Sequence, residues 1–152
     1  MQLDALITQL RQPVLDDAVR HLTHADTPHY RNAGTDEVRN WLGELYDVVQ
    51  RAIVARSLAD VDNYAAALAQ RRFAAGFSLG EVQLAFNATE HALWVATVSS
   101  VLPRHDLVVA LGLESSAFGS VKDAVAREYL GLAAHRHTPA VDIPAVASGA
   151  FA

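Results

Sequence analysis

The sequence contains no cysteine among its 152 residues. Disulfide bonds, thiolate zinc sites and cysteine nucleophiles are therefore excluded. A chain of this length buries about 70% of the surface that its unfolded form exposes, so one hydrophobic core can stabilise it without cross-links. The lack of disulfides agrees with a reducing compartment, and we expect a soluble, cytoplasmic protein.

Long apolar runs and an excess of positive charge are also missing. No segment reaches the roughly 18 consecutive apolar residues of a transmembrane helix, so we expect no membrane span. The N-terminus lacks the basic and apolar regions of a signal peptide. The formal net charge of −5 argues against a nucleic-acid partner, because such proteins normally present a basic face.

Apolar residues recur at spacings of three and four along most of the chain, which is typical of helices with one buried face. Five such stripes span residues 3–22, 38–53, 61–73, 82–102 and 107–132. Pro13 interrupts the first stripe, which predicts either one kinked helix or two short helices. No strand alternation and no internal repeat is present. The sequence therefore predicts an all-α bundle of five to six helices.

Residues at the ends of these stripes predict where the helices begin and end. Residues 24–34 are polar and include Pro28 and Gly34, which indicates a loop. Gly76 is expected to end one helix. Ser78 and Glu81 have the S-x-x-E spacing of a capping box that begins the next. Other expected helix starts are Thr35, the similar pattern Ser57–Asp60, and Asp106.

The composition changes after His137. Residues 138–152 hold two prolines, one charged residue and many small residues, without periodicity. We therefore expect one helical domain over residues 1–137, followed by a flexible tail or the start of a linker over residues 138–152.

Catalytic motifs are missing from the sequence. It contains no P-loop and no G-x-G-x-x-G pattern, and residues 76–80, which match the letters G-x-S-x-G, lack the preceding strand of a nucleophile elbow. Glu81, Glu90, Glu114 and Glu128 occur on the two longest predicted helices, but they do not form the E-x-x-H pairs of a di-iron bundle. We assign no catalytic residue and expect a protein that is not an enzyme.

Seven histidines raise the question of a metal or haem site. His21 and His24 are three residues apart and could share a helix face, but a third ligand is not evident, and a solvated helix end explains them equally well. We therefore assign no metal and no cofactor.

His91 lies on an apolar helix face, one turn from Trp94. It could be an axial haem ligand or a buried pH-responsive group, although a hydrogen-bonded core histidine is the commoner case. A phosphotransfer role is disfavoured, because Trp94 and Val95 occupy the Lys and Gly places of the His-x-x-Lys-Gly pattern.

Two groups of residues are candidates for binding. Phe86, His91 and Trp94 could line an internal ligand pocket. A stripe on the last helix could form a dimer face, and its residues are Phe118, Val121, Val125 and Tyr129. Packing in the core explains both groups equally well.

The segment Asn63–Phe86 carries a particular order of features. A helix with Tyr64-Ala65 and Arg71-Arg72 is followed by Gly76-Phe77-Ser78 and by a helix that opens Leu79-Gly80-Glu81. This order resembles the N-terminal domain of the RsbR-type stressosome co-antagonists. The upstream pairs Trp41-Leu42 and Leu45-Tyr46 and the long last helix are similar to that family too. The resemblance extends from Leu3 to His137.

The resemblance implies a globin-like fold without haem, a homodimer and a role in stress-related signal transduction. In that family a STAS domain commonly follows and carries the phosphorylatable residues; no such part is present here, so no phosphoacceptor is assigned. We expect a non-enzymatic sensory or signal-input domain that binds a small ligand or a regulatory protein partner. The alternatives are a haem- or gas-binding globin that uses His91, or a plain helical adaptor.

Overall fold

A computed structural model describes residues 2–137, and this part of the chain folds into six helices. The predicted all-α bundle of five to six helices is confirmed. The predicted tail, residues 138–152, lies outside the described residues. None of the described helices is long and apolar enough to cross a membrane. The helices are α1 (Gln2–His24), α2 (Pro28–Ala33), α3 (Thr35–Ala55), α4 (Val61–Ala74), α5 (Leu79–Val98) and α6 (Arg104–His137).

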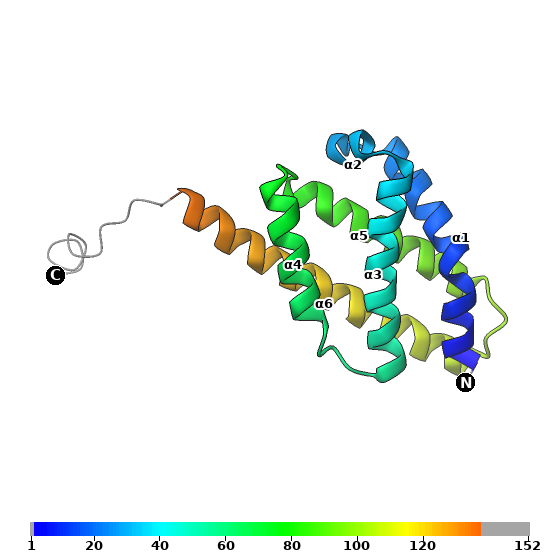
Figure 1. The fold of residues 1–152 in the computed structure, drawn as a ribbon. Coiled ribbons are helices and arrows are strands. Elements are labelled where there is room, and N and C mark those ends of the chain that lie inside the picture. Colours follow the sequence, from blue (N-terminus) through cyan, green and yellow to red (C-terminus); the bar gives the residue numbers. More distant parts are fainter. Residues whose placement is uncertain (1, 138–152) are drawn as a thin grey trace, which may run out of the picture.

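The helices form two layers (Figure 1). Helices α1, α3 and α4 run across α5 and α6, and the hydrophobic core lies between the layers. Helix α5 packs against α1 and α6, while α4 packs against α6 and α3 packs against α1. The short helix α2 sits at one end of this arrangement, where it contacts α1 and α3.

Helix α1 continues through Pro13 as one helix. Pro13 is exposed, and so is Gln9, whose carbonyl loses its helical partner to the proline. Water can satisfy that carbonyl on the exposed side. The buried residues Ile7 and Val14 hold the helix against the core before and after the proline. Of the two interpretations of this segment, the single helix is the one that forms.

The loop predicted for residues 24–34 is wrong in part, because α2 forms within it. Pro28 is the first residue of α2, a position that needs no backbone N–H donor. Tyr30 is only 3% exposed and anchors the helix to the core. Gly34 joins α2 to α3 with a φ of 91°, which a residue with a side chain adopts only with strain. A six-residue helix is too short to show a periodic pattern in the sequence.

Helix ends follow the sequence where the local pattern is complete. The Ser78 side chain accepts a hydrogen bond from the Glu81 backbone at 3.1 Å, and Glu81 Oε1 accepts one from the Ser78 backbone at 3.4 Å, so the predicted capping box is confirmed. Gly76, with a φ of 87°, follows the end of α4 as expected. The cap predicted at Ser57–Asp60 does not form, and Thr35 makes no side-chain cap.

Substituting Ser78→Ala should lower the free energy of unfolding by about 1 kcal/mol, because the backbone N–H of Glu81 loses its partner at the start of α5. Chemical denaturation measures this change. Ser99→Ala, at the exposed other end of α5, is the matched control and should change the stability little. Equal losses in the two variants would contradict the role of the cap.

Candidate functional site

The three predicted pocket residues lie in different environments. Phe86 is 2% exposed and packs in the core, whereas Trp94 is 39% exposed and His91 is also on the surface of α5. His91 and Trp94 border an open depression together with Asn87, Glu90 and Ser115. The structure therefore does not join Phe86, His91 and Trp94 in one internal pocket.

The candidate dimer face on α6 lies in the core, which is the alternative that the sequence also allowed. Phe118, Val121, Val125 and Tyr129 are all at most 5% exposed within a single chain. They fill the space between the layers, since α6 packs against α3, α4 and α5. A second copy of the chain cannot reach this stripe without opening the core.

The histidines do not assemble a metal site in the described structure. His21 lies beside His91, with 5.7 Å between the ring centroids. Its neighbour is therefore His91 and not His24, the residue with which it could have formed a metal site. Within residues 2–137, no group of three or more His, Asp or Glu side chains could hold a metal ion.

The most unusual buried group is the guanidinium of Arg72. It lies on the inner face of α4, which also carries Val61, Ala65 and Leu68, and Arg72 is only 5% exposed. Burying a charge costs several kcal/mol unless a partner compensates it. No carboxylate forms an ion pair with Arg72 in the described part of the chain. Its charge is therefore stabilised in some other way.

Two aromatic rings, Trp41 and Phe77, lie against the guanidinium and a third, Tyr30, packs on both, and we call these three residues the aromatic box. Arg72 Cζ lies 3.9 Å from the centre of the Trp41 ring and 5.5 Å from that of Phe77. The three rings meet edge to face, with centroids 5.0 to 5.9 Å apart. The electron-rich ring faces attract the cation and offset part of its desolvation. Burial raises the pKa of Tyr30. The charge of Arg72 and a side-chain hydrogen bond between Arg72 and Tyr30 lower this pKa and so oppose the effect of burial.

Two donors of Arg72 have no partner. Nε and Nη2 are buried without a hydrogen bond, and the buried hydroxyl of Tyr64 is also unpaired. Burial raises the pKa of Tyr64, and the nearby charge of Arg72 opposes this rise, so the two groups interact. Three buried polar atoms without a partner thus belong to two residues of α4. Groups of this kind normally have a partner, which makes them a candidate ligand site.

The position of the aromatic box depends on Glu81, which is 7% exposed. Its carboxylate accepts hydrogen bonds from the backbone N of His29 at 3.0 Å and from His29 Nδ1 at 2.7 Å. Burial opposes the charge, but the hydrogen bonds from His29 and Ser78 outweigh it and lower the pKa of Glu81. The His29 ring also packs on Phe77, with 4.9 Å between centroids. Glu81 therefore ties α2, and with it Tyr30, to the start of α5.

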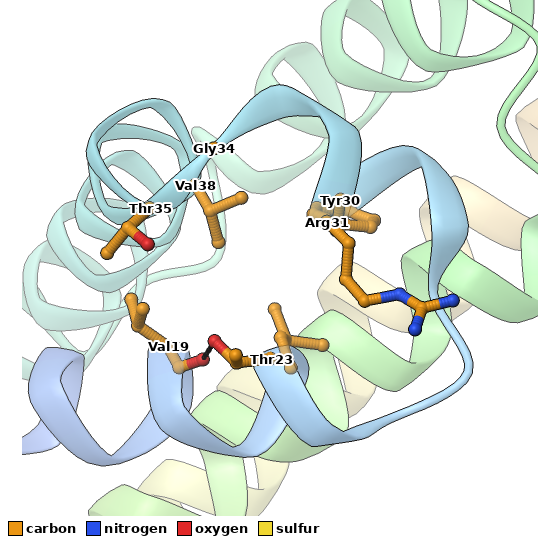
Figure 2. A pocket seen from close by; sticks show the side chains of 8 residues that line it. Val19, Thr23, Tyr30, Arg31, Gly34, Thr35 and Val38 are labelled. Carbon is orange, nitrogen blue, oxygen red and sulfur yellow. Dashed lines mark hydrogen bonds between the residues drawn. The ribbon is translucent and has the colours of Figure 1, made fainter.

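A cavity of about 210 Å³ lies next to the box, between α1, α2 and α3 (Figure 2). Tyr30 belongs to the wall of this cavity and to the box. The hydroxyl of Thr23 is already used, since it donates to the Val19 carbonyl at 2.9 Å, and Figure 2 shows Arg31 extending away from the cavity. The cavity is partly open and its lining is mostly apolar, and a space of this size can hold a small organic molecule. Its walls are formed by Val19, Leu22, Thr23, Tyr30, Arg31, Gly34, Thr35 and Val38.

Glu114 is a second buried charged residue, at a distance from the box. It is 0% exposed on α6, and its Oε1 accepts a hydrogen bond from Thr97 at 2.6 Å, while Oε2 has no partner. Burial raises the pKa of Glu114 to about 7, against the opposing effect of the Thr97 hydrogen bond. Glu114 is therefore largely protonated below neutral pH.

The burial of Arg72 and Glu114 was not predicted from the sequence, although a signal was present. Arg72 follows Leu68 by four residues, and Glu114 follows Leu111 by three, so each continues an apolar stripe of its helix. Their charge argued for the surface, because Arg and Glu are rarely buried without a partner. A charged residue at an inner position of a stripe is the pattern that could have identified them.

Comparisons with models of protein families, with curated proteins and with solved structures find no match to this chain.

Replacing Glu114 by Gln should remove a pH dependence of stability. The pKa of Glu114 is about 7 in the folded state against 4.5 for an ordinary glutamate, so folding binds a proton between these values. Its contribution to stability is therefore full below about pH 4.5 and declines as the pH rises to about 7. As the pH rises over this range, the melting temperature of Glu114→Gln should therefore increase relative to that of the unchanged protein.

Glu37→Gln is the matched control, because Glu37 is exposed at the start of α3. Its melting temperature should follow that of the unchanged protein at every pH. A Glu114→Gln variant that also does so would show that Glu114 does not titrate in this range.

Proposed function

We propose that this protein is a non-enzymatic sensory or signal-input domain, which binds a small ligand at Arg72 and the aromatic box. The buried guanidinium with two unpaired donors is the observation that carries this proposal. A core built for stability alone would gain from an apolar residue of similar volume at this position. Buried charges that lack a compensating partner are more typical of binding sites.

The chemistry of these groups favours binding over catalysis. An arginine does not lose its proton in proteins, so Arg72 cannot act as an acid or a base. Burial raises the pKa of Tyr64, so its hydroxyl also keeps its proton at neutral pH. Neither group can move a proton to or from a ligand, but both can donate hydrogen bonds to one.

Helix α2 is the element through which binding would be transmitted. It carries Tyr30, a wall of the box, and is joined to α3 through Gly34. A ligand that changes the position of Tyr30 also changes that of α2. For this to be a signal, the ligand must bind one arrangement of α2 better than another.

We further propose that the domain dimerises through the outer face of α5. Leu84, Val95 and Val98 are 43 to 53% exposed there, and Trp94 is 39% exposed. Around His91 the face is nearly symmetric, since Leu84 and Val98 are each seven residues away, and Ala88 and Trp94 are each three away. In an antiparallel pair of α5 helices centred on His91, Leu84 would meet Val98 and Ala88 would meet Trp94 of the other copy, as the symmetry of a two-fold interface allows.

The globin-like character, the stress response and a regulatory protein partner rest on the resemblance to RsbR-type sensor domains. The alternative of a haem- or gas-binding globin rests on His91, which is on the surface beside His21. A plain adaptor is the alternative in which Arg72 binds nothing.

A ligand screen by thermal shift tests the proposed function, with Arg72→Met as the comparison. Methionine keeps most of the apolar volume and removes the donors, so the variant should fold at least as stably as the unchanged protein. Ligands of the site should raise the melting temperature of the unchanged protein and leave that of Arg72→Met unaltered. A broad screen in which no compound separates the two proteins would contradict the proposal.

Sedimentation equilibrium tests the dimer. The unchanged protein should sediment as a dimer, and Val95→Glu should be a monomer, because it buries a charge on each side of the interface. Leu130→Glu is the control, since Leu130 is a 68% exposed residue of α6 outside this face. A monomeric unchanged protein, or a Val95→Glu variant that remains a dimer, would rule out this interface.

A further inference from the structure

We propose that the ligand is a small monocarboxylic acid with an apolar body, whose carboxylate binds to Nε and Nη2 of Arg72 and to the hydroxyl of Tyr64. This inference rests on the proposed function, because it names the chemical class of the ligand at the same site.

The geometry of the unpaired donors favours a carboxylate. The N–H groups of Nε and Nη2 point from the same edge of the planar guanidinium, and this fork matches the two oxygens of one carboxylate. The protein itself shows the occupied form of this fork. Arg11 binds Asp47 with Nε at 2.9 Å from Oδ1 and Nη2 at 3.2 Å from Oδ2. At Arg72 the same two atoms are buried and have no acceptor.

The charge at the site favours a ligand with one negative charge. Glu81 is the buried acid at the box, and its oxygens are engaged by His29 and Ser78. Glu44 acts on Tyr64, but it is 57% exposed and lies 3.9 Å from Arg71. One uncompensated positive charge remains at Arg72. A monoanion neutralises it, whereas a dianion such as phosphate would leave a net negative charge buried.

The surroundings favour an apolar body on this carboxylate. The guanidinium lies against the aromatic box, and the adjoining cavity of about 210 Å³ is bordered by Val19, Leu22 and Val38. Tyr30 stands in the wall between the cavity and the box. An acid that fills the cavity and reaches Arg72 must displace the Tyr30 ring, which couples binding to the position of α2.

Fluorescence of Trp41 provides a direct readout, because its ring lies 3.9 Å from Arg72 Cζ and the chain has only one other tryptophan. The experiment uses the full chain with Trp94→Phe, titrated with sodium benzoate at constant ionic strength. Benzamide is the uncharged control of the same shape, and inorganic phosphate is the dianion control. Benzoate should change the fluorescence in a saturable way and raise the melting temperature by roughly 5 to 10 °C at one hundred times its dissociation constant.

Three variants test the assigned donors. Arg72→Met and Arg72→Lys should each weaken benzoate binding at least tenfold, and the lysine variant keeps the charge while losing the fork. Tyr64→Phe should weaken it about two- to tenfold, as expected for the loss of one hydrogen bond. Circular dichroism verifies that each variant is folded. If Arg72→Met does not fold, the comparison with Arg72→Lys still decides the test.

The outcomes separate the inference from the proposed function. The inference that the ligand is a carboxylate would be overturned if benzamide binds as tightly as benzoate. It would also be overturned if Arg72→Lys binds benzoate as tightly as the unchanged protein. Phosphate that saturates the site in an Arg72-dependent way would also overturn it, yet would leave a ligand site at Arg72 in place. A further outcome is that benzoate has no effect while the screen yields Arg72-dependent ligands of another class. That result would overturn the carboxylate ligand and leave the ligand site at Arg72 in place.

Discussion

The carboxylate of Glu81 joins two parts of the structure that are distant in sequence, the start of α5 and helix α2. It closes the capping box at the start of α5, and it holds the backbone and the ring of His29, 52 residues earlier in the chain. These hydrogen bonds keep Glu81 ionised in spite of its burial. Through His29 they place α2 and therefore Tyr30, so the aromatic box around Arg72 depends on this one carboxylate.

Arg72 and Glu114 show two responses to the burial of a charged group. Glu114 can release its charge by binding a proton, and burial raises its pKa accordingly. Arg72 cannot do so, because a guanidinium stays protonated in proteins. Aromatic faces offset part of its cost, but two donors remain unpaired. The difference explains why Glu114 is compatible with a structural role, whereas Arg72 favours a ligand.

Helix α5 shows how far an apolar pattern can be interpreted without the tertiary structure. The sequence shows apolar residues over most of its circumference, and such a pattern is typical of a helix that is covered on all sides. In the structure α1, α3 and α6 cover only part of it. Trp94 and Val95 remain exposed, whereas Phe118 and Val125, which the sequence left open as a dimer face or as core, fill the core. Both assignments depended on which helices become neighbours.

Local sequence patterns were sufficient to predict the all-α class, several helix boundaries and the capping box at Ser78, because these depend on interactions within a few residues of the chain. They did not determine α2, whose six residues are held by Tyr30 in the core and by Glu81. The burial of Arg72 likewise depends on Trp41, which lies on another helix. These features depend on the packing of the helices, because burial results from contacts between segments that are far apart in sequence.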